Sequence, residues 1–143
     1  MQPTHFRASL LVFALLLGSC GGSDQEPLEP RDSQSIAIRS NGSIFQVPLG
    51  TGLFFNLSPG GFLEFAAPTA VVWSVTTGNP SQPSSGTRHS HNGAVLSTTT
   101  SPTRSRSFFA SVPGQVPQGA VARFTVTAAT QPETVFLLFV INP

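Results

Sequence analysis

The chain has 143 residues, enough for one domain, and only 9% of them are charged, well below the roughly 25% usual in soluble domains. The net charge of +1 argues against nucleic acid as a partner, because binding through a broad surface needs many more basic residues. One cysteine excludes an internal disulfide and a cysteine-cluster metal site. With 39% apolar residues, the chain is too hydrophobic to be disordered throughout.

The first 20 residues have the pattern of an export signal. An apolar run over 8–17, interrupted only by Ser9, follows a short N-terminal segment that carries Arg7. The run is shorter than the roughly 20 residues that a membrane-spanning helix needs, and its length is typical of a secretory signal. Small residues follow it and lead to the only cysteine of the chain, in the order Leu17-Gly18-Ser19-Cys20.

This order resembles the lipobox of bacterial lipoproteins. The resemblance implies that the Cys20 thiol takes up a diacylglyceryl group, that residues 1–19 are removed, and that the new amine is often acylated. Two or three acyl chains suffice for stable membrane attachment. The resemblance also implies that Gly21, in the place of the retention signal Asp, favours the outer membrane in a Gram-negative host. The alternative is an ordinary secretory signal with a chance cysteine.

Residues 20–34 are predicted to be a disordered tether that begins at the lipidated cysteine. The stretch 21–34 contains two prolines, two glycines and almost nothing apolar, and its net charge is −3. Such a segment cannot bury a core, so we expect a loose coil that spans about 20 Å, or about 45 Å when fully extended.

Residues 35–143 are predicted to form one β-domain that begins with a hairpin. Asn41-Gly42 is the preferred two-residue type I′ turn. Pairing outward from it sets Ser40 opposite Ser43, Ile38 opposite Phe45, and Ile36 opposite Val47. The apolar residues then share one face, and Arg39 and Gln46 lie on the other.

The rest of the domain reads as short strands separated by turns, without a convincing amphipathic helix. Val71, Trp73 and Val75 share one face of their strand, and we expect Trp73 at the centre of the core. The last run is apolar without alternation, which predicts a central strand covered on both faces. The predicted strands after the hairpin are 53–57, 62–65, 70–76, 94–99, 107–112, 120–127 and 134–141.

This pattern predicts an all-β, antiparallel β-sandwich. The strands Val71–Val75 and Phe124–Thr127, with a polar loop between them, resemble bacterial immunoglobulin-like modules. The resemblance covers about half of the domain and implies an immunoglobulin-like sandwich. The inter-sheet cysteine pair and the corner tyrosine of antibody domains are both absent.

Few residues of the domain could perform chemistry. Its only carboxylates are Glu64 and Glu133, and nothing in their spacing suggests a catalytic pair. The sequence has neither a Gly-x-Ser-x-Gly nucleophile elbow nor a glycine-rich phosphate loop ahead of a helix. We therefore expect no enzymatic activity and no cofactor.

Two polar clusters remain as candidate binding sites. His89 and His91 lie in a polar loop over 77–93, and histidines two apart on an extended segment could share a metal. Arg88, Arg104 and Arg106 could contact an anion. For both clusters the alternative is simple solvation, of a polar loop in the first case and of strand-edge arginines in the second.

The doublets Phe54-Phe55 and Phe108-Phe109 each place one ring off the main core side, because neighbouring residues on a strand point to opposite faces. That ring either packs in a second layer or is displayed to a partner. The sequence thus supports two hypotheses. The first is a lipid-anchored envelope protein with a structural or protein-interaction role, whose envelope partner is unknown. The second is a periplasmic module that binds a metal at His89 and His91 or a ligand in a Phe-lined apolar pocket.

Overall fold

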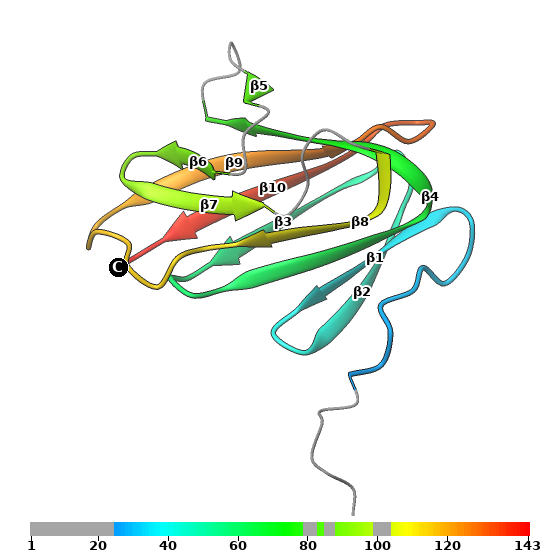
Figure 1. Cartoon of the computed structure of the whole chain (residues 1–143), viewed down its shortest axis with the longest axis horizontal. Coiled ribbons are helices and arrows are strands. Elements are labelled where there is room, and N and C mark those ends of the chain that lie inside the picture. The colour runs from blue at the N-terminus through cyan, green and yellow to red at the C-terminus, as the bar shows by residue number, and fades with distance from the viewer. Residues whose placement is uncertain (1–24, 79–82, 85–87, 99–103) are drawn as a thin grey trace, which may run out of the picture.

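The computed structural model describes residues 25–78, 83–84, 88–98 and 104–143, which are all-β (Figure 1). In these ranges no helix is present that could cross a membrane. Ten strands follow one another along the described chain: β1 (Ser35–Ser40), β2 (Ser43–Pro48), β3 (Gly52–Leu57), β4 (Phe62–Thr77), β5 (Pro83–Ser84), β6 (Arg88–His91), β7 (Ala94–Thr98), β8 (Arg104–Ser111), β9 (Val121–Ala128) and β10 (Thr134–Ile141).

The first hairpin has the predicted register. β1 and β2 pair antiparallel with Ser40 opposite Ser43, and the apolar pairs Ile38–Phe45 and Ile36–Val47 follow outward. The backbone φ angles of Asn41 and Gly42 are 48° and 79°, the left-handed values that a type I′ turn requires at both positions. The prediction of this hairpin is confirmed.

One strand replaces two of those predicted. Residues 62–65 and 70–76 belong to the single strand β4, whose register against β8 shifts between Ala66 and Val71. Pro68 lies in this irregular stretch, where its missing N–H costs no ladder hydrogen bond. Residues 62–66 of β4 pair with β8, most of them also with β1, and Val71 and Val72 again pair with β8. From Trp73 onward β4 pairs with β9, and at its end also with β5. β4 therefore passes from one sheet to the other, as corner strands of sandwiches do.

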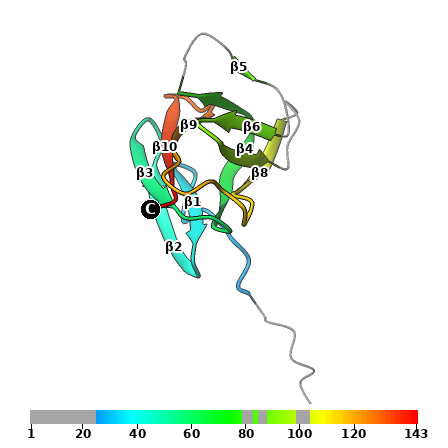
Figure 2. The ribbon, with the colours of Figure 1, turned by 90° about the vertical axis from the view of Figure 1, so that its left-hand side faces the viewer.

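The strands form two layers, which Figure 2 shows nearly edge-on. The first sheet has the order β2-β1-β4-β8-β7-β6, and the second has the order β3-β10-β9-β4-β5. The predicted β-sandwich is confirmed. One pair departs from the antiparallel arrangement, since β3 runs parallel to β10.

Aromatic rings fill the centre of the core between the two sheets. Trp73 is 3% exposed and stacks on Phe108 with ring centroids 5.2 Å apart. Phe65 contacts both rings and also reaches Phe136 of the second sheet. The indole N–H of Trp73 donates to the carbonyl oxygen of Ser105 at 3.0 Å, so burial leaves this polar group paired. The predicted burial of Trp73 is confirmed.

β10 is central in its sheet, between β3 and β9, but only one of its faces is covered. Phe136, Leu138 and Val140 are fully buried in the core. Val135, Leu137, Phe139 and Ile141 alternate with them and are partly exposed on the outer face, over which no strand of the described chain packs. The prediction that both faces of this strand are covered was wrong. An unbroken apolar run indicates that both faces are apolar, but it does not show that other elements pack against both.

The polar stretch 77–93 contains structure that the sequence analysis did not predict. β5 pairs with the end of β4, and β6 pairs with β7. The turn between β6 and β7 is Asn92-Gly93, with φ angles of 49° and 77°, a second turn of the type at residues 41–42. The hairpin was missed because β6 consists of polar residues and lacks the alternation that marked β1 and β2.

Candidate functional site

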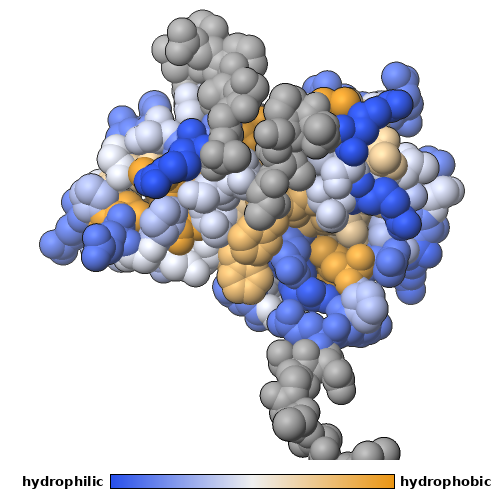
Figure 3. Space-filling view, in the orientation of Figure 1, coloured by the Kyte–Doolittle hydropathy of each residue, from blue (hydrophilic) through white to orange (hydrophobic). Residues whose placement is uncertain are grey.

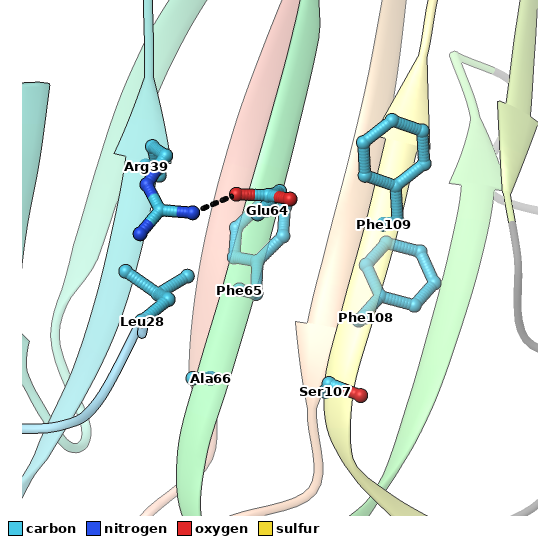
Figure 4. Close-up of a pocket in the computed structure, with 8 residues that line it drawn as sticks. All are labelled: Leu28, Arg39, Glu64, Phe65, Ala66, Ser107, Phe108 and Phe109. Carbon is cyan, nitrogen blue, oxygen red and sulfur yellow. Dashed lines mark hydrogen bonds and ion pairs between the residues drawn. The ribbon is translucent and has the colours of Figure 1, made fainter. Parts of the chain in front are cut away.

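A groove lies on the outer face of the first sheet, where β1, β4 and β8 run side by side (Figure 4). Its volume is about 300 Å³. Leu28, ahead of the first strand, lines one side of the groove, and the other lining residues belong to the three strands. The lining residues are Leu28, Arg39, Glu64, Phe65, Ala66, Ser107, Phe108 and Phe109.

An ion pair occupies the floor of the groove. Arg39 of β1 and Glu64 of β4 are directly opposite each other in the sheet, so their side chains emerge on the same face. The Nη1 atom of Arg39 lies 2.7 Å from Oε2 of Glu64, and the two side chains are 9% and 33% exposed. Nη2 of Arg39 donates to the carbonyl oxygen of Glu26. Arg39 lies on the outer face as predicted, but this face is covered at Arg39.

The cover is residues 25–34, which were predicted to be a loose coil. Gln46 of β2 holds this segment through its side-chain amide: Oε1 accepts from the Arg31 N–H at 3.0 Å, and Nε2 donates to the Glu29 carbonyl at 3.2 Å. The Glu29 carboxylate pairs with Nη2 of Arg106 at 3.2 Å, where both side chains are exposed. The segment thus lies docked along the sheet instead of standing away from it.

The docking can be tested by proteolysis next to Arg31. In the full chain, Gln46→Ala is expected to raise the rate of tryptic cleavage after Arg31 about five- to tenfold, because it removes two of the side-chain hydrogen bonds that hold the segment, those nearest to Arg31. Mass spectrometry of the fragments over time gives the rate. Gln118→Ala, in an exposed turn before β9, is the matched control and should leave the rate unchanged. Equal rates in both variants and the wild type would show that the segment is not held there.

The groove is better suited to docking a segment than to acid–base chemistry. The Glu64 carboxylate is engaged by the guanidinium of Arg39, so this side chain is already held in an ion pair within the sheet. Glu133 is exposed in the turn between β9 and β10, in the other sheet. The structure therefore does not bring the two carboxylates of the domain together.

The two candidate histidines lie on β6 and point to the same side, as their spacing predicts. His89 is 3% exposed, whereas His91 is partly buried and lies against the backbone of Gly78, where an added Cβ would be 3.1 Å from its Nε2 atom. Within the described ranges, no group of three or more His, Cys, Asp or Glu side chains could hold a metal ion. The structure thus supplies no third ligand from these residues.

The three candidate arginines do not form one cluster. Arg88 of β6 is opposite Ser97, which is in turn opposite Ser111 at the end of β8. Arg104 begins the same strand seven residues earlier, about 23 Å away along its length. Arg106 is already engaged by Glu29 and by the carbonyl of Ala67 at 3.4 Å. A shared anion site of all three is therefore not formed.

The phenylalanine doublets divide as predicted, with one ring of each leaving the core. Phe108 is buried, and Phe109 stacks on Phe62 outside the first sheet, with centroids 5.8 Å apart. Apolar patches of this face are visible among polar side chains in Figure 3. Phe55 packs against the core and edge-on against Phe45, whereas Phe54 is 65% exposed. The first doublet thus displays a ring to solvent.

Comparison with known proteins gives little further. No protein-family model matches the chain, and no curated protein does. Two solved structures match the chain with low TM-scores. Domains 4 and 5 of the S-layer protein SbsC have 14% identity and a TM-score of 0.39, over 75% of this chain and 53% of that one. A nucleoside hydrolase-related hypothetical protein from Saccharophagus degradans, associated with carbohydrate metabolism, has 13% identity and a TM-score of 0.35 over 76% and 25%. At these TM-scores neither likeness bears on function.

Sequence reasoning missed the covered ion pair and the segment that covers it. Leu28 is the only large apolar residue between Cys20 and Ser35, and this isolated residue was the one available signal that the segment has a hydrophobic contact. Cys20 itself lies outside the described residues.

Proposed function

We propose that the chain is a lipid-anchored protein of the bacterial cell envelope, exported and held by acyl chains on Cys20, with a sandwich that serves a structural or protein-interaction role. The observation that carries this proposal is the only cysteine of the chain, placed directly after a short apolar run in Leu17-Gly18-Ser19-Cys20. A thiolate is the side chain that forms a stable thioether with a lipid, and chance rarely puts a single cysteine at that position.

The docked segment gives the anchor a physical consequence. The hydrogen bond from Arg39 reaches Glu26, so only residues 21–25 separate Cys20 from the sandwich. Six residue steps span at most about 20 Å, against about 45 Å if the whole segment 21–34 were extended. An anchor on Cys20 would therefore hold the sandwich close to the membrane surface, with the first sheet nearer to the attachment point than the second.

Detergent phase partitioning tests the anchor. Wild-type protein from a bacterial host is expected in the detergent phase, with an intact mass that lacks residues 1–19 and includes the added acyl groups. Cys20→Ser removes the only thiol and should leave the protein unlipidated. Ser19→Ala, a substitution by another small residue in the same motif, is the matched control and should still be lipidated. A wild-type protein at unlipidated mass in the aqueous phase would overturn the proposal.

A further inference from the structure

One side of the sandwich is apolar and free of charge. The chain has no charged residue from 40 to 63, a stretch that includes β2 and β3. Of the large apolar side chains that the described residues expose, most lie on these two strands, which meet through the Phe45–Phe55 ring contact. They are Ile44, Phe45, Leu53 and Phe54. We call this side the apolar edge.

The backbone of β3 leaves hydrogen-bonding groups at the apolar edge. In the described chain β3 pairs with β10 alone. Val135 donates its N–H to the Thr51 carbonyl at 3.2 Å. This bond shows that the backbone groups of Thr51, and of every second residue after it, face β10. Because successive residues of a strand direct their N–H and C=O groups to opposite sides, Leu53 and Phe55 face β10. Gly52, Phe54 and Asn56 direct theirs to the open side.

β3 lacks the features by which natural sheets protect an open edge. Charges, prolines and bulges discourage strand addition. At the other end of the second sheet β5 carries Pro83, and at one end of the first sheet β6 carries Arg88. β3 has the sequence GLFFNL, with no charge, no proline and no register shift against β10. An unprotected apolar edge of this kind favours pairing with another strand.

We propose that β3 pairs with β3 of a second copy of this chain, antiparallel, with Phe54 opposite Phe54 of the partner. This inference goes beyond the proposed function and does not depend on the anchor. The register follows from the strand itself. Antiparallel partners must point to the same face, so an outward residue such as Phe54 must meet Gly52, Phe54 or Asn56 of the other copy. Each of these registers is two-fold symmetric, but only the pairing of Phe54 with itself pairs all three open-side residues within the strand, because Gly52 then meets Asn56 on both sides of the axis.

The side chains at the proposed axis support a second copy as the occupant. A shallow apolar hollow of about 270 Å³ lies beside Phe54, lined by Gly52, Leu53, Val135 and Leu137. In the proposed register the partner's Phe54 is the diagonal cross-strand neighbour of Gly52. Because Gly52 has no side chain, it leaves room for that ring. The copies can approach without like-charge repulsion, since neither strand carries a charge. One strand pair is a small interface, so the dimer should be favoured where the chains are concentrated.

Disulfide cross-linking of the full chain tests the register. In Phe54→Cys, the two new thiols lie opposite each other, with Cα atoms about 5.5 Å apart, within the range for a disulfide. Copper phenanthroline oxidation in intact cells of the expressing host is expected to give much more covalent dimer than the unsubstituted chain gives. The unsubstituted chain reports any background from Cys20. Asn56→Cys thiols would be two residues out of register on each strand, about 13 Å apart, and should not react. Val121→Cys, on an exposed apolar residue of β9, is the matched surface control.

Sedimentation of the full chain in detergent tests the backbone pairing. Asn56→Pro removes an N–H that points to the open side and leaves the β3–β10 ladder intact. We expect it to weaken dimerisation at least about tenfold, and Phe54→Arg to abolish it, whereas Val121→Arg should leave it unchanged. A chain that is monomeric at all concentrations, an Asn56→Cys dimer as abundant as that of Phe54→Cys, or a Phe54→Cys adduct with a different protein would each overturn the proposal.

Discussion

Trp73→Ala is expected to lower the free energy of unfolding by about 3–5 kcal/mol, a large part of the usual 5–15 kcal/mol of a domain. The substitution removes the indole that stacks on Phe108 and packs against Phe65, and it opens a cavity between the sheets. It also leaves the carbonyl of Ser105 without its hydrogen-bond donor. Neighbouring rings cannot fill the space without moving the strands that carry them.

Urea unfolding of a soluble form, residues 25–143, followed by circular dichroism measures the loss. Val72→Ala is the matched control, since Val72 is next to Trp73 on the same strand but is partly exposed, and it should cost no more than about 1 kcal/mol. Trp73 is the only tryptophan, so wild-type emission reports its environment alone. It should be blue-shifted and resist iodide quenching. Red-shifted, readily quenched emission with an unchanged Trp73→Ala midpoint would contradict the packing described for the core.

Glu64→Ala is the second substitution expected to have a large effect, about 2–3 kcal/mol of destabilisation. It leaves the guanidinium of Arg39, whose side chain is 9% exposed, without its carboxylate partner. The estimate is below the cost of breaking a fully buried pair because Glu64 is one third exposed. Arg39→Met removes the charge and keeps an apolar side chain of similar length. The double variant Arg39→Met/Glu64→Leu should therefore regain much of the stability that Glu64→Ala loses.

Urea unfolding of the wild type, Arg39→Met, Glu64→Leu and the double variant Arg39→Met/Glu64→Leu forms a double-mutant cycle for this pair. Glu133→Ala is the matched control, because Glu133 is the other carboxylate of the domain and lies exposed in a turn, and its effect should be within about 0.5 kcal/mol. Strictly additive effects of the Arg39 and Glu64 substitutions would show that the ion pair contributes nothing to stability.

The sequence predicted those parts of the fold that depend on residues close together in the chain. Asn41-Gly42 specified both the turn and the register of the first hairpin, because that turn requires two left-handed residues and the apolar alternation allows one register. The same turn at Asn92-Gly93 was missed, since the residues before it are polar and read as loop. The strand pattern around Trp73 gave its burial correctly, because a strand has only two faces and one of them was apolar.

The candidate site depends on contacts that no local pattern encodes. Arg39 and Glu64 are 25 residues apart, and Glu29 and Arg106 are 77 apart. The alternation of β1 placed Arg39 on the outer face, but only the path of residues 25–34 across that face decided that the arginine is covered. The composition of this segment predicted a coil, because the segment has no apolar periodicity. In the structure it is held by hydrogen bonds from Gln46 of the sheet, which composition does not reveal.

By itself, then, the sequence determined the class of fold, the first hairpin, the buried tryptophan and the expectation of an anchor at Cys20. Each of these depends on residues close together in the chain: a turn, an alternation of period two, or a short motif. Only the tertiary structure decided that β4 crosses between sheets, that β3 runs parallel to β10 with an open side, and that residues 25–34 dock on the first sheet. These features depend on contacts between segments far apart in the chain. Which segment pairs with which edge, or packs on which face, is decided only when the whole core is packed.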